Sequence, residues 1–180
     1  MSELTAAFDE EVVMASERAM TFENFFLEQY PGVYASLCLI TRNSHEAEEI
    51  AQDAFMKMWE RWDTVESIED PVAYVHSIAM NSFRRRYRRT RLAMRRTLRL
   101  TPPDDLLAAV EEREAIVRRL SSLSSRQRAA IVLTDLLDYT SDEAAQMLGM
   151  RPGAVRSLAS RGRAELRRAE GWGRHDTDEG

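Results

Sequence analysis

One short segment of the chain concentrates arginine, a residue type that binds phosphate well. Residues 84–99 contain nine arginines and no acidic residue, and Tyr87 lies within the run. No acid stands four residues from any of these arginines, and unpaired charges are not buried in protein cores. These side chains must therefore lie in water or against an anion. A solvated basic face is one interpretation, but the missing acids and the interleaved Tyr87 favour binding to nucleic-acid phosphates.

A second set of polar side chains recurs at helical spacing near the C-terminus. On a helix beginning at Pro152 these residues point away from the apolar side. Arginine can pair with both acceptors of guanine in the major groove or hold a phosphate. The alternative is an ordinary helical hairpin with a solvated face. The set consists of Arg156, Ser157, Ser160, Arg161 and Arg163.

The residues that could support catalysis or bind a metal are poorly placed for either role. Glu48 and Glu49 are adjacent, so they diverge on a helix and do not form an acid–base pair. The histidines at 45, 76 and 175 are dispersed, and the single cysteine, Cys38, lies in the apolar stretch 33–40. No glycine-rich phosphate loop is present. The sequence predicts no catalytic site, no metal and no cofactor.

Charge is sorted along the chain, whose net charge is −5. Residues 1–83 carry a net charge of −12, residues 84–99 carry +9, and residues 100–180 carry −2. Such segregation indicates two unlike partners, one recognised by an acidic surface and one by a basic surface.

The elements that position these residues are predicted to be helices, giving an all-α fold. Glycine and proline are scarce, with 7 and 5 residues, and no alternating β-branched stretch is evident. One helix covers about 21–41. A second is capped by Ser44 and buries an apolar stripe. This stripe comprises Ile50, Ala54, Phe55, Met58, Trp59 and Trp62, and Met56 is expected to fill core space as well.

After a loop at about 63–70, Asp70-Pro71 reads as an N-cap followed by proline at the first helical position. This helix has no stop signal before the arginines, so a core-packed half continues into the basic segment. The inward positions are Tyr74, Val75, Ile78 and Ala79.

The C-terminal part contains a helix-turn-helix pattern. Thr140 and Glu143 form a capping box, and Gly149 suits the left-handed residue that ends a helix. Pro152 then starts a second helix, which runs to about Arg168. Ala145, Gly149 and Val155 have the small, glycine and aliphatic side chains needed where two such helices cross closely.

Two small helical domains follow from this pattern. We expect an N-terminal arm at 1–20, a first domain at 21–96, a flexible linker at 97–109, a second domain at 110–170 and a disordered tail at 171–180. The apolar stretch at 33–40 is too short to span a bilayer, and the acidic N-terminus lacks the basic start of a signal peptide. These features predict a cytoplasmic protein without membrane insertion.

With the motifs in order, the chain resembles the extracytoplasmic-function (ECF) sigma factors, the small promoter-recognition subunits of bacterial RNA polymerase. The resemblance covers about residues 22–168. Three motifs carry it, together with the arginine run and the helix-turn-helix. They read AEEIAQDAFMKMW at 47–59, DPVAYVHSIAMN at 70–81 and LSSRQR at 123–128.

The resemblance implies a role for each segment. The helix carrying Glu48, Glu49, Gln52 and Asp53 is similar to the one that docks on the clamp helices of core RNA polymerase. The helices at about 111–137 would lie against the polymerase flap. The helix-turn-helix would read the double-stranded −35 element of promoter DNA through Arg151, Arg156, Ser157, Ser160, Arg161 and Arg163.

The resemblance also assigns a surface for the −10 element, whose bases are recognised as single-stranded DNA. The loop from Asp63 to Glu69 corresponds to a pocket for a flipped base, and Asn81 to a position that reads the strand. Anti-sigma factors are common partners in this family, and the sequence leaves open whether one restrains this chain. The expected −10 residues are Asp63, Thr64, Val65, Glu66, Ser67, Asn81, Arg84, Arg85 and Arg88.

The main alternative is a transcription regulator that binds operator DNA as a dimer through residues 140–168. That protein would bind a palindromic site tightly without polymerase. A sigma factor would bind weakly alone and direct transcription once core polymerase is added.

Overall fold

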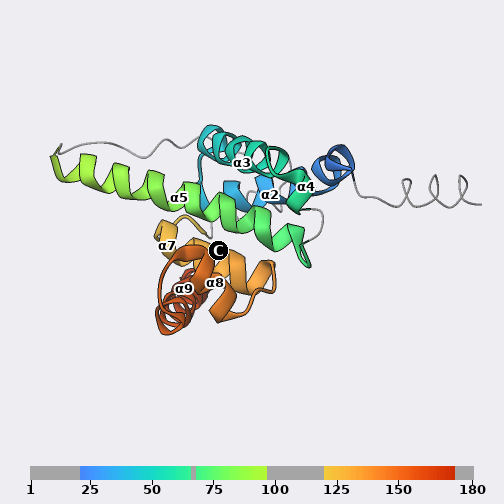
Figure 1. Ribbon diagram of the computed structural model, residues 1–180. Coiled ribbons are helices and arrows are strands. Elements are labelled where there is room, and N and C mark those ends of the chain that lie inside the picture. The colour runs from blue at the N-terminus through green and yellow to red at the C-terminus, as the bar shows by residue number, and fades with distance from the viewer. Residues whose placement is uncertain (1–20, 66–67, 97–119, 173–180) are drawn as a thin grey trace, which may run out of the picture.

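The computed structural model of the protein describes residues 21–65, 68–96 and 120–172, and all its regular elements in these ranges are helices. The expected all-α fold is confirmed. The long helix α5 lies between α2 and α3 on one side and α7 to α9 on the other (Figure 1). The elements are α2 (Phe22–Thr41), α3 (Ser44–Trp59), α4 (Trp62–Val65), α5 (Pro71–Arg96), α7 (Ser125–Ile131), the π-helical turn η1 (Val132–Leu136), α8 (Ser141–Leu148) and α9 (Pro152–Trp172).

An aromatic cluster joins α2, α3 and α4. Phe25 and Phe55 are buried, and the ring of Trp62 lies 5.3 Å from that of Phe25. The predicted packing of Trp62 against the core is therefore confirmed. For Trp59 and Met56 it is wrong, because these side chains are 64% and 59% exposed. Their neighbours on α3 occupy the inward positions, and successive helical residues point about 100° apart.

Local capping signals fix most helix starts. Asp70 Oδ1 accepts a hydrogen bond of 2.8 Å from the backbone of Ala73, which confirms the predicted start of α5. The predicted cap of α3 was wrong by one residue. Asn43, not Ser44, accepts from the backbone of Glu46, at 2.9 Å, and Ser44 is the first helical residue. Asn43 has the extended backbone that capping requires.

The helix-turn-helix has the predicted local geometry. Thr140 and Glu143 form a reciprocal capping box at the start of α8. Gly149 ends α8 with φ of 57°, a left-handed conformation that glycine adopts without steric cost. Ala145 and Val155 are buried where α8 and α9 pack together. α9 ends at Trp172, beyond the predicted Arg168 and two residues into the predicted tail.

The two groups of helices share one continuous apolar core instead of separate ones. Met80 and Phe83 of α5 belong to the same buried cluster as Leu148 of α8. Arg128 of α7 is 5% exposed and donates from Nε to the backbone oxygen of Ile40 at the end of α2, at 2.8 Å. The arm at 1–20, the linker at 97–109 and the tail from 173 lie outside the described residues.

The buried His76 and the half-buried Tyr139 make a polar contact between the two groups. Nδ1 of His76 lies 2.8 Å from the hydroxyl of Tyr139. Burial is the main cause that lowers the pKa of His76 to about 4, and the nearby Asp70 carboxylate opposes this effect. The imidazole is therefore neutral at neutral pH, and protonating it in the folded protein costs free energy.

We expect acidification to weaken this packing. A histidine whose pKa is depressed in the folded state supports folding fully above its ordinary pKa, near 6.5. This support is lost as the pH falls from about 6.5 towards 4. Between pH 7.5 and 5.5 the free energy of unfolding should fall by roughly 1 kcal/mol more than in a His76→Asn variant. Urea unfolding at both pH values measures the difference, and equal losses in the two proteins would refute the prediction.

Candidate nucleic-acid interface

The face of α5 that points away from the core carries a basic hollow of about 450 Å³. The predicted residues Asn81, Arg84, Arg85 and Arg88 all lie in its wall. The side-chain oxygen of Asn81 accepts a hydrogen bond of 3.0 Å from Arg84, which orients both groups. The full lining is Lys57, Arg61, Tyr74, Ser77, Ile78, Asn81, Arg84, Arg85 and Arg88.

Several lining residues were not predicted as part of a site. Tyr74 and Ile78 were expected to face inward; they are half-buried and pack against the core, and they also form part of the wall. Tyr74, Ile78, Asn81 and Arg85 follow one another at intervals of four, three and four residues, which places all of them on the same helix face. Lys57 and Arg61 come from the end of α3 and the turn after it. Their approach to α5 is a tertiary contact that no local pattern records.

In the segment expected to hold a flipped base, some residues are exposed and one is buried in the core. Asp63 and Thr64 are exposed, whereas Val65 is 1% exposed and packs in the core. Part of the predicted loop forms the short helix α4, so Val65 is positioned by its packing and is not presented to a ligand. Glu66 and Ser67 lie outside the described residues.

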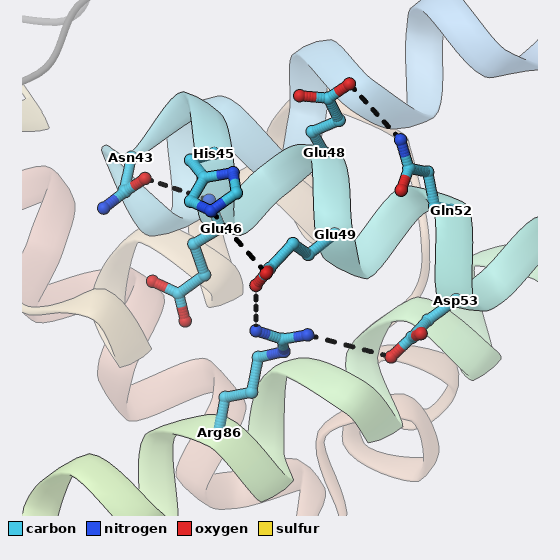
Figure 2. A network of polar contacts seen from close by, with 8 residues as sticks. All are labelled: Asn43, His45, Glu46, Glu48, Glu49, Gln52, Asp53 and Arg86. Carbon is cyan, nitrogen blue, oxygen red and sulfur yellow. Dashed lines mark hydrogen bonds and ion pairs between the residues drawn. The ribbon is translucent and has the colours of Figure 1, made fainter.

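The acidic helix α3 pairs with the basic helix α5 through Arg86. This guanidinium donates to Glu49 Oε2 and lies 3.8 Å from a carboxylate oxygen of Asp53 (Figure 2). The expectation that every arginine of the run would point into water or onto an external anion is therefore wrong for Arg86. Its acidic partners stand 33 and 37 residues earlier, so no helical spacing indicates them.

The outer face of α3 has a different character. Glu48 and Gln52 are exposed and joined by a hydrogen bond of 3.3 Å, as Figure 2 shows. Met56 and Trp59 continue this face towards the C-terminal end of the helix. An exposed methionine and tryptophan beside polar side chains are typical of a protein-binding surface.

The second helix of the helix-turn-helix presents its predicted residues to solvent. Arg151, Arg156 and Ser157 are exposed, as are Ser160 and Arg161. Arg163 differs, because it makes two hydrogen bonds of 2.7 and 2.9 Å to Asp135 of η1. The guanidinium holds the pKa of the Asp135 carboxyl below its ordinary value.

In the part of the chain that the structure describes, we find neither a cluster of metal ligands nor a membrane-spanning helix. No group of three histidine, cysteine, aspartate or glutamate side chains gathers there as metal ligands. Nor does any helix of those residues combine the length and the apolar character of a membrane span.

Family models match both halves of the chain. Residues 25–100 match sigma-70 region 2, and residues 113–166 match sigma-70 region 4. The chain is 31% identical over 157 residues to the ECF RNA polymerase sigma factor SigM of Mycobacterium tuberculosis, with 84% of this chain and 78% of SigM covered. It is 26% identical to the RNA polymerase sigma-E factor of Streptomyces coelicolor, covering 82% of this chain and 85% of that protein.

Solved structures share the fold. The sigma factor RpoE in complex with the anti-sigma factor NepR, from Bartonella quintana, has a TM-score of 0.63 at 24% identity and covers 83% of this chain and 96% of its own. CnrH in complex with the cytosolic domain of CnrY has a TM-score of 0.53 at 21% identity, covering 93% and 97%. The matched regions, the sequence identity to SigM and the shared helical fold lead to one conclusion: the chain belongs to the ECF family of RNA polymerase sigma factors.

Proposed function

We propose that this chain binds core RNA polymerase and directs it to promoters by contacting both the −10 and the −35 elements. The observation that carries the proposal is the hollow on α5, where five basic side chains surround Tyr74 and Asn81. In this proposal the polymerase supplies the catalytic site, and the chain itself catalyses no reaction. It acts in the cytoplasm, where polymerase and promoters are found.

The hollow suits an unstacked DNA strand. Arginine and lysine side chains provide electrostatic attraction for the backbone, and an aromatic ring beside them can stack on a base. Separating a base from its neighbours costs a few kcal/mol per step, so a site that captures the base favours local melting. Tyr74 and Asn81 are the groups proposed to contact bases, and Arg85 and Arg88 the groups proposed to contact phosphates. Asp63 and Thr64, which precede α5 in the sequence, are exposed on α4.

For polymerase docking we propose the outer face of α3, with Met56 and Trp59 as the apolar centre and Glu48 and Gln52 as polar contacts. Interface centres are enriched in methionine and aromatic residues, which bury large areas on binding. Glu49 and Asp53 were expected to share this role. Their contacts with Arg86 instead support a role in fixing α3 against α5.

For the −35 element we propose that the exposed face of α9 enters the major groove. Arg156 and Arg161 have the donors to read guanine, and Ser157 and Ser160 lie beside them. Arg151, which directly precedes α9, is proposed to contact a phosphate of the DNA backbone. Because Arg163 is held by Asp135, we assign it to support of η1, which precedes the helix-turn-helix.

A run-off transcription assay tests the proposal. Purified chain with core polymerase should give promoter-specific transcripts, and neither component alone should do so. Arg156→Ala should cost about 1–3 kcal/mol of promoter binding and relax the preference at one −35 position. Templates that vary each −35 base pair measure this effect.

Thr134→Ala is the control for fold integrity, because the Thr134 hydroxyl bonds only within its own half of the molecule in the described contacts. Tight binding to a palindromic site without polymerase would support the dimeric regulator instead. If Arg156→Ala weakened all −35 variants equally, Arg156 would have no base-reading role.

A further inference from the structure

The ion pair between Asp135 and Arg163 joins the turn η1 to the exposed side of α9. Arg163 donates from Nε to Asp135 Oδ2 at 2.7 Å and from Nη2 to Oδ1 at 2.9 Å. Two parallel hydrogen bonds between a guanidinium and a carboxylate add energy and geometric specificity compared with a single bond. Because the contact lowers the pKa of the Asp135 carboxyl, both groups are charged at neutral pH, and the positive charge of Arg163 is largely neutralised.

Arg163 lies on the same face of α9 as two residues proposed to read the −35 element. Arg156, Ser160 and Arg163 follow one another at intervals of four and three residues, and all three are exposed. Seven residues of helix span about 10 Å, and the major groove of DNA is about 12 Å wide. With Arg156 over the bases, Arg163 therefore lies near the edge of the groove, where the phosphates are.

The turn that carries Asp135 has an unusual backbone. η1 is π-helical, and the backbone of Leu137 donates to Val132 O, five residues earlier, at 3.0 Å. Turns of this kind are rare and frequently occur at functional sites. This one presents the Asp135 carboxylate to Arg163, which is 28 residues later in the chain.

We propose that Asp135 limits the affinity of α9 for DNA: by pairing with Arg163 it withholds a guanidinium that would otherwise bind a phosphate at the edge of the −35 major groove. This inference rests on the proposed function. It adds that an acidic residue outside the set proposed to contact DNA sets the strength of binding. Because phosphate contacts carry no sequence information, Asp135 leaves the base preference unchanged.

The acid opposes phosphate binding in two ways. While the pair is intact, Arg163 attracts DNA only weakly. If Arg163 left the pair for a phosphate, the Asp135 carboxylate would remain unpaired beside a strongly negative backbone, and like charges repel. Exposed ion pairs are weak by themselves, so this repulsion is what keeps a phosphate from displacing the carboxylate. The consequence is weaker attraction to the many non-promoter sites of a genome, which are bound through phosphates.

The first test neutralises Asp135 in the holoenzyme. Asp135→Asn keeps the size of the side chain and removes its charge, which frees Arg163 for a phosphate. The plot of log affinity for promoter DNA against log salt should become steeper by about 0.9, and at 0.2 M salt binding should be about fourfold tighter. The gain should be equal on templates that vary each −35 base pair. A plot no steeper than that of the wild type, or a gain confined to one −35 sequence, would overturn the inference.

Asp138→Asn is the matched control. It removes the same charge close to η1, and asparagine tolerates the left-handed backbone at this position, where φ is 55°. In the described contacts Arg163 pairs with Asp135 and not with Asp138. The salt slope and affinity of this variant should match those of the wild type. An equal gain in both variants would show a general effect of charge and refute the specific role of Asp135.

The second test removes the guanidinium. Arg163→Ala alone should keep the wild-type salt slope, because the paired side chain makes no phosphate contact. In that background Asp135→Asn should no longer steepen the plot. Two results would contradict the inference. One is a slope flattened by about 0.9 in Arg163→Ala, which would mean that Arg163 already binds a phosphate. The other is a full gain from Asp135→Asn without Arg163.

The same titrations separate this inference from the proposed function. If the wild-type holoenzyme binds promoter and non-promoter DNA with equal affinity, the proposed function fails. If it prefers promoter DNA and Arg156→Ala relaxes the −35 preference, but Asp135→Asn binds no more tightly, the proposed function stands and the role of Asp135 is refuted.

Discussion

Replacing Arg84, Arg85 and Arg88 together with alanine should flatten the salt dependence of promoter-complex formation. The plot of log affinity against log salt should become shallower by about 2 to 3, because each lost phosphate contact removes about 0.7–0.9 from the slope. At 0.2 M salt this corresponds to a loss on the order of 30- to 80-fold in affinity. The three guanidinium groups line the hollow on α5 and are the main source of its positive charge. Titration of holoenzyme with fluorescent promoter DNA at several salt concentrations measures the slope.

Arg86→Ala provides the matched control on the same helix. Arg86 is paired with Glu49 and Asp53, so its positive charge is largely neutralised and attracts DNA phosphates only weakly. Its removal should leave the salt slope unchanged. A slope that stays the same in the triple variant, or falls equally in Arg86→Ala, would contradict phosphate binding in the hollow.

Arg128→Ala should destabilise the protein by about 3 kcal/mol or more, a large share of the 5–15 kcal/mol typical of a domain. The guanidinium is buried and donates to Ile40 O, Leu123 O and the Ser125 hydroxyl. Burial lowers the pKa of Arg128 to about 10, so the group is still charged at neutral pH. Removing it leaves buried acceptors without their donors and opens a cavity. Urea unfolding at pH 7.5 measures the change.

Arg126→Ala is the control two residues earlier on α7. Arg126 is exposed, and its described contact is the cation–π interaction with Tyr87, so the expected cost is below about 1 kcal/mol. If Arg128→Ala cost no more than Arg126→Ala, the buried hydrogen bonds of Arg128 would contribute little to stability.

The local signals of the sequence placed most helix boundaries correctly. The Asp70-Pro71 start of α5, the Thr140 capping box and the left-handed Gly149 were all predicted, and all are confirmed. Each depends on residues within four positions of one another, so the chain specifies it without reference to the rest of the fold. The missed cap at Asn43 lies one residue from the predicted position, within the usual uncertainty of helix ends.

Which face of a helix is buried was harder to predict. The apolar pattern of α3 includes Trp59 and Met56, but only the residues facing α2 and α5 are covered. Hydrophobicity describes a side chain's preference, whereas burial depends on where neighbouring helices lie. Likewise, the residue types in the basic run predicted its site role, but the hollow also needs Lys57 and Arg61 from beyond α5.

By itself the sequence determined the all-helical elements, their caps, the helix-turn-helix and the sorting of charge along the chain. Only the tertiary structure decided that Arg86 pairs with Glu49, that Arg128 is buried against α2, and that the two halves close on each other through α5 and α8. The physical reason is the separation along the sequence over which each kind of interaction acts. Caps and helical periodicity act over a few residues, whereas these contacts join residues 37 to 88 positions apart, and their energy depends on the packing of the whole chain.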